Sequence, residues 1–78
     1  MREKKPRVVV TFHTTAEAMA TEKACRDRSI AGKLISAPRE LSADCGIAWC
    51  GAAETRGALE GALSDAGIEY AGLHEMEL

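Results

Sequence analysis

Large side chains are scarce in this sequence, which has one Phe, one Trp and one Tyr among its 78 residues. Alanine is its main small apolar residue, so any core must be assembled from small pieces. A chain of this size buries only about 60–65% of the surface that its unfolded form exposes. We therefore expect one domain with a modest core. Dimerisation would bury more surface, and a homodimer stays open as an alternative.

Long hydrophobic runs are also missing. The apolar run from Val8 to Phe12 is far too short for the core of a signal peptide or for a membrane span. Nothing else in the sequence resembles a targeting signal. We therefore expect a cytoplasmic protein with no membrane partner.

An excess of positive charge is absent as well, since the formal net charge is −2. This balance argues against a nucleic-acid partner, whose phosphates would select a basic surface. The basic side chains at the N-terminus are more typical of a solvated tail than of a binding arm. We interpret residues 1–6 as a basic tail and residues 7–78 as a single small domain.

Cysteine is infrequent, and its number, three, is odd. Without a secretory context, the sequence predicts reduced thiols and no disulfide framework. Four residues separate Cys45 from Cys50, whereas a compact zinc knuckle places two residues between its cysteines. His13 and His74 are too far apart in the sequence to show the spacing of a pair of metal ligands. We predict neither a metal nor a cofactor.

What the sequence does contain is a regular alternation of short segments. Arg7 to Phe12 is β-branched and apolar, which predicts a central strand. Thr14 and Glu17 have the spacing of a capping box and predict a helix that runs to about Arg28. The remaining patterns predict strands at 32–36, 47–50 and 68–74, a helix at 54–66, and an acidic tail after the last strand.

The order β-α-β-β-α-β predicts an α+β fold of the ferredoxin-like type, a four-stranded antiparallel sheet with both helices on one face. Right-handed crossovers place the first and third strands in the centre. Gly67 suits the position just after the second helix. Gly57 and Gly61, inside that helix, are expected to permit a close approach of helix and sheet.

Residues 38–46 form a long polar loop that ends in Cys45 and Gly46. In the predicted topology this loop lies at the same end of the sheet as His13, Thr14 and the first turn of the first helix. A helix N-terminus carries about half a positive charge and offers unpaired N–H donors, both of which favour a thiolate. Arg39 would assist if it folds back, whereas a nearby Asp44 would oppose this effect.

The other two cysteines are predicted to lie elsewhere. Cys50 is five residues beyond Cys45, which is about 16 Å along a regular strand. A disulfide requires Cα atoms within about 7 Å, so Cys45 would act alone. Cys25 and Cys50 are most simply interpreted as small buried apolar residues. Likewise, Thr14 and Glu17 are more typical of helix caps than of ligands, His13 of a strand-end residue, and Gly46 of a backbone requirement.

The stretch from Phe12 to Gly46 resembles a family of small bacterial domains of unknown function that are described as selenium/sulfur carrier-like proteins. The resemblance covers about residues 8–50. Its motifs are a strand that ends in Phe, a Thr-rich turn, a helix with Ala and Glu-Lys, a Leu-Ile segment, a Pro-Arg pair and Ser-x-x-Cys-Gly. They correspond here to Phe12, Thr14-Thr15, Ala18, Glu22-Lys23, Leu34-Ile35, Pro38-Arg39 and Ser42 to Gly46.

This resemblance implies a carrier and not an enzyme with turnover of its own. Cys45 would hold the transferred atom as a persulfide or perselenide, and Arg39, Ser42 and Gly46 would form its loop. A cysteine desulfurase-type donor and an acceptor protein are the implied partners. Cys50 receives no role from the family. The alternatives are a protein-interaction module with structural cysteines and, ranked last, a metal-binding regulatory domain.

Overall fold

A computed structural model describes residues 4–41 and 46–78 of the chain. Its strands are β1 (Pro6–Thr11), β2 (Lys33–Ser36), β3 (Ile47–Ala52) and β4 (Gly72–Glu77). Its helices are α1 (Thr15–Asp27) and α2 (Arg56–Asp65), and a 3-10 turn, η1 (Ala53–Thr55), precedes α2. No helix in the described ranges is long and apolar enough to cross a membrane.

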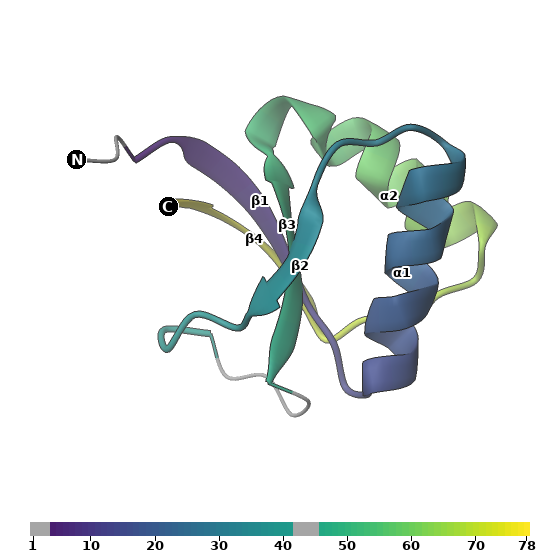
Figure 1. The fold of residues 1–78 in the computed structure, drawn as a ribbon, viewed down its shortest axis with the longest axis horizontal. Helices are drawn as coiled ribbons and strands as arrows, with labels where there is room; N and C mark the ends of the chain where they lie inside the picture. Colours follow the sequence, from purple (N-terminus) through teal and green to yellow (C-terminus); the bar gives the residue numbers. More distant parts are fainter. Residues whose placement is uncertain (1–3, 42–45) are drawn as a thin grey trace.

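The four strands form one antiparallel sheet in the order β2-β3-β1-β4. Both helices lie on one side of this sheet and leave its other side open (Figure 1). The element order and the central position of β1 and β3 are those that the sequence predicts. The fold is therefore an α+β fold of the ferredoxin-like type, as expected.

The core lies between the sheet and the two helices. β1 contributes Val8 and Val10, and Phe12 follows directly after it, all with no exposed surface. Val9 points to the side of the sheet away from the helices, and its side chain is fully buried as well. This double burial explains why β1 is nearly all apolar whereas the edge strands are not. The helices and β3 complete the core with Ala18, Cys25, Leu59, Leu63 and Trp49.

The start of α1 is fixed by the predicted capping box. The Thr14 hydroxyl accepts a hydrogen bond from the Glu17 N–H at 3.2 Å, and the Glu17 carboxylate accepts one from the Thr14 N–H at 3.3 Å. Two backbone donors at the helix end are satisfied in this way. The interpretation of Thr14 and Glu17 as caps is therefore confirmed.

Both helices end in Schellman motifs. After α2, the Ile68 N–H donates to the Leu63 carbonyl and the Gly67 N–H to the Ser64 carbonyl, with Gly67 at φ 65° as predicted. After α1, the equivalent left-handed position is Ser29, at φ 58°. A left-handed conformation costs roughly 1–2 kcal/mol for a residue with a side chain, so α1 ends less favourably than α2.

The predicted last strand is wrong in its position. β4 runs from Gly72 to Glu77 instead of 68–74, so the expected acidic tail is in fact strand. Residues 68–71 carry the chain back to the sheet, where the Ala71 N–H donates to the Thr11 carbonyl. Glu75 is tolerated because β4 is an edge strand and because this carboxylate forms an ion pair with Arg56 of α2.

Smaller differences concern β3 and α2. β3 continues two residues beyond the predicted end, through Gly51 to Ala52, because Gly51 leaves room for the neighbouring chain. A Cβ at Gly51 would lie 3.0 Å from the Ala31 carbonyl oxygen. The predicted helix start at 54 is wrong as well, since η1 occupies those residues and α2 begins at Arg56.

Gly57 and Gly61 do not have the role that the sequence suggests. A Cβ placed at either position would meet no atom within 4 Å, so neither glycine permits a close approach of α2 to the sheet. The residues of α2 that are buried against the core are Leu59, Ala62 and Leu63. The prediction of glycine-dependent packing is therefore wrong.

Candidate functional site

The candidate site lies at one end of the sheet, where several elements begin or end. Thr11, the last residue of β1, pairs with Ala48 near the start of β3, and Ser36 at the end of β2 pairs with Ile47. α1 begins only four residues after Thr11. The loop between β2 and β3 therefore starts and ends at the same end of the molecule as the α1 N-terminus (Figure 1). This part of the predicted geometry is confirmed.

The base of the β2–β3 loop is closed by a backbone hydrogen bond. The Ala37 N–H donates to the Gly46 carbonyl at 3.0 Å, which extends the β2–β3 ladder by one pair. Gly46 has φ 74°, a left-handed conformation that favours glycine. Further along the loop, the Leu41 N–H donates to the Pro38 carbonyl at 3.0 Å and closes a turn around Arg39. The two ends of the loop are thus joined to each other at the end of the β2–β3 ladder.

The predicted site residues fall into two groups. Cys45 and Ser42 lie outside the described residues, so their placement stays a prediction. His13, Thr14 and Gly46 all lie at the end of the sheet where β1 ends and α1 begins. Arg39 is exposed and forms no hydrogen bond or ion pair with any other residue that the structure describes. Its predicted assistance to a thiolate therefore has no support from the described contacts.

The N-terminus of α1 is less open than the sequence suggests. One oxygen of the Glu17 carboxylate accepts hydrogen bonds from the His13 N–H at 2.8 Å and from the Thr14 N–H at 3.3 Å. A carboxylate at this position partly offsets the positive end of the helix dipole. The N–H groups of Thr15 and Ala16 lie in the first turn, where no helical carbonyl is available to accept from them, and no other described residue accepts a hydrogen bond from them.

This consequence of Glu17 is what the sequence interpretation missed. The signal was present, because Thr14 and Glu17 were recognised as a capping box. A capping box always brings an acidic or amide side chain back over the first turn, where it competes with any other anion. Among the described residues, the Glu17 carboxylate therefore opposes the electrostatic help that the sequence predicts for a thiolate at this end.

Cys25 lies away from this end. It is fully buried in the core, two residues before the end of α1. Burial raises the pKa of its thiol, and the positive charge of Arg28 opposes part of that increase. Burial and a raised pKa together make an inert thiol. The interpretation of Cys25 as a small apolar core residue agrees with this environment.

Cys50 has a different environment from Cys25. It is half-buried, and it pairs with Lys33 of β2 and Val9 of β1 on the side of the sheet away from the helices. The regular strand places its Cα about 10 Å from that of Ile47, at the start of β3. Within the described part of the chain, no three His, Cys, Asp or Glu residues gather as a metal site would require.

A family model described as "Putative Se/S carrier protein-like" matches residues 7–75, nearly the whole of the chain. The chain belongs to this carrier-like family. The match confirms the resemblance seen in the sequence and extends it beyond residue 50, where no motif was recognised. No curated protein and no solved structure matches the chain.

Membership of the carrier-like family bears on the whole domain and not only on the loop. The matched region begins at the second residue of β1 and ends within β4, so it includes at least part of every helix and strand described above. The family description supports a role in carrying sulfur or selenium. It assigns no role to any particular side chain.

Proposed function

We propose that the protein carries sulfur or selenium on the thiol of Cys45, as a persulfide or a selenosulfide, between a donor and an acceptor protein. The observation that carries this proposal is the family match over nearly the entire domain. The fold adds a second support, since the loop that contains Cys45 is closed at its base beside the α1 N-terminus. Cys45 is the only cysteine of the chain in that loop.

The chemistry needs no outside oxidant. The Cys45 thiolate attacks the terminal sulfur of a donor persulfide, R–S–SH, whose S–S bond breaks as the new one forms. The donor leaves as a thiolate, and its terminal sulfur stays on Cys45 with its proton. The acceptor removes this sulfur by the same exchange in reverse. Selenium transfer follows the same path, with selenium as the terminal atom.

Two features of the chain suit this task. The Thr15 and Ala16 amides lie at the same end as the loop and are donors suited to the terminal anion of a persulfide. A neighbouring thiol would discharge the persulfide by forming a disulfide, and the other cysteines are badly placed to do so. Cys25 is buried in the core, and Cys50 lies along β3 away from the loop end. The carrier would therefore release its atom only to an external acceptor.

Incubation with a cysteine desulfurase and L-cysteine tests the proposal by intact-protein mass spectrometry. We expect a mass increase of one sulfur atom that dithiothreitol removes. The increase should be lost in Cys45→Ser and retained in Cys50→Ser, the matched control. No adduct on the folded wild-type protein, or an adduct that persists in Cys45→Ser, would overturn the proposal.

A protein-interaction module with structural cysteines is the competing function, and thiol reactivity separates the two. A carrier thiol should react with iodoacetamide near neutral pH at least as fast as free cysteine. A structural Cys45 would react slowly until the protein is denatured. Peptide mapping assigns the modified residue, and Cys25 serves as the internal reference for a buried thiol.

A further inference from the structure

The open face of the sheet holds a second group of residues, at the end opposite to the β2–β3 loop. Arg7 of β1 pairs with Ala52 of β3, and Lys33 of β2 pairs with Cys50 of β3. Directly paired residues point to the same side of a sheet. Trp49, one residue from Cys50, points into the helix-covered core. Arg7, Lys33 and Cys50 therefore all point away from the helices.

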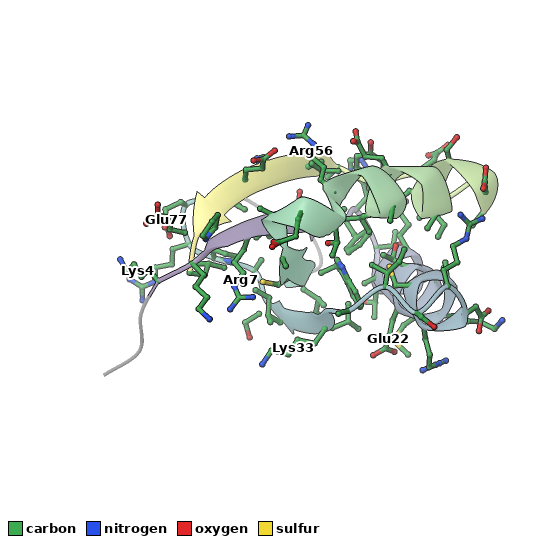
Figure 2. All side chains as sticks on the ribbon, turned by 90° about the horizontal axis from the view of Figure 1, so that it is seen from above. Lys4, Arg7, Glu22, Lys33, Arg56 and Glu77 are labelled. Carbon is green, nitrogen blue, oxygen red and sulfur yellow. The ribbon has the colours of Figure 1, made fainter. Side chains whose placement is uncertain are left out.

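The spacing of these residues creates a hollow. From the strand spacing and the rise per residue, the Cα atoms of Arg7 and Lys33 lie about 12 Å apart, on either side of β3. Figure 2 shows the two side chains on the strands that flank β3. Between them β3 has only small residues, Cys50 to Ala52, which form the floor of the hollow. The long side chains of Arg7 and Lys33 form its rim.

The resulting cavity has a volume of about 590 Å³, which is within the range of small-molecule sites. Among the described residues, Arg7 and Lys33 are the only charged side chains that line it, and Leu78 adds the carboxylate of the last residue to the same wall. Its walls are otherwise mostly apolar. They consist of Ala31, Gly32, Ile35, Cys50, Gly51, Ala52 and Leu78.

The charges of the rim are unpaired within the described residues. Neither Arg7 nor Lys33 forms an ion pair there, whereas Lys23, Arg28 and Arg56 each pair with a carboxylate on the helical side. Two unpaired cations over an apolar floor select a ligand that is both anionic and apolar. Two exposed cations of this kind add little to the affinity for a ligand, but they strongly favour an anionic ligand over a neutral or cationic one.

We propose that this cavity binds a small organic anion, with its carboxylate between Arg7 and Lys33 and its apolar body on the floor formed by Cys50 and Ala52. Leu78 and Ile35 bound the apolar part. The site is separate from the β2–β3 loop and does not depend on the carrier function.

Titration of the ¹⁵N-labelled full chain with 4-phenylbutyrate tests the proposal by NMR. We expect saturable shifts of the amides of residues 31–33 and 50–52, and no saturable shifts there with the uncharged 4-phenylbutyramide. Phenylbutyrate should also slow the alkylation of Cys50 in a Cys45→Ser background. Equal binding of the acid and the amide, or shifts confined to other residues, would overturn the proposal.

Substitutions identify the cations. Arg7→Met and Lys33→Met each keep an apolar stem and should weaken phenylbutyrate binding by roughly two- to fivefold. Lys23→Met, on the exposed side of α1, is the matched control and should leave binding unchanged. Retained dispersion of the amide spectrum verifies that each variant is folded. Unchanged affinity in both test variants would contradict the assignment.

A labelled oligoglutamate peptide distinguishes a protein partner from a small ligand. We expect the dissociation constant of phenylbutyrate, measured from the amide shifts of the cavity residues, to be no larger than that of the peptide. If only the peptide shifts the amides of residues 31–33 and 50–52, the face is a docking surface for an acidic protein. The small-molecule assignment is then wrong.

Discussion

Cys25 shows how a residue that is often reactive becomes structural. Its thiol has no exposed surface and lies among the apolar side chains between α1 and the sheet. Burial disfavours the charged thiolate and raises the pKa of Cys25 above its ordinary value, although Arg28 lowers it in part. The folded protein therefore retains a proton that the unfolded chain loses at alkaline pH.

This difference predicts an alkaline loss of stability. Because the folded-state pKa is the higher one, the stabilising contribution is fully present below about pH 8.5, the ordinary thiol pKa. It is lost as the pH rises from there through the folded-state pKa. In urea titrations, the free energy of unfolding should decrease between about pH 7 and about pH 10, and this decrease should be smaller for Cys25→Ala than for the wild type. Cys50→Ala is the control and should keep the wild-type decrease. Equal decreases in wild type and Cys25→Ala would contradict this explanation.

At the scale of elements, α2 carries two glycines for which its packing gives no reason. Gly57 and Gly61 face open space, and glycine inside a helix costs roughly 0.5–1 kcal/mol relative to alanine. We expect Gly57→Ala and Gly61→Ala each to raise the free energy of unfolding by about 0.5–1 kcal/mol in urea titrations. Gly67→Ala should lower it, because Gly67 has φ 65°. A loss of stability in Gly57→Ala or Gly61→Ala would mean that α2 needs these glycines.

Element type and order followed from the sequence, whereas the bounds of the later elements did not. The capping box and the apolar run of β1 are local signals, so α1 and β1 were predicted closely. β4 depends on a non-local fact, namely that strand pairing begins where Ala71 reaches the Thr11 carbonyl. The apolar side chain of Ile68 suggested the start of a strand. In the structure Ile68 packs against the core in the segment that precedes β4.

For the candidate site, too, the arrangement of the elements could be predicted from the sequence, whereas the contacts between side chains could not. Antiparallel topology alone brings Gly46 to the end of the sheet where α1 begins, and the sequence gives that topology. The effect of Glu17 on the helix terminus required the geometry of its hydrogen bonds. The open-face cavity was missed because its cations, Arg7 and Lys33, are far apart in the sequence. They become neighbours of β3 only when the strand order is known.

At the scale of the molecule, the two proposed sites lie at opposite ends of one sheet. The β2–β3 loop belongs to the end where β1 finishes, and the cavity belongs to the end where β1 starts. The paired central strands β1 and β3 run from one end to the other. Under the two proposals, the carrier function belongs to the loop end of the sheet and the binding of a small organic anion to the opposite end.

The sheet also depends on its last strand, which the sequence analysis placed too early. Val8 has no exposed surface and pairs with Glu75 in β4. Removing residues 75–78 would expose the edge of β1 and the core beneath it, and would delete the Arg56–Glu75 ion pair. A small domain is stable by only about 5 kcal/mol, so this loss should unfold most molecules.

Trp49 provides the measurement, because it is the single tryptophan and only 2% of its surface is exposed. We expect the truncated chain to show red-shifted Trp49 emission and reduced far-ultraviolet circular dichroism at room temperature. Glu75→Gln separates the ion pair from the strand and should cost little stability, because the pair is half exposed. If the truncated chain keeps the emission of a buried tryptophan, then β4 contributes less to stability than its pairing with β1 implies.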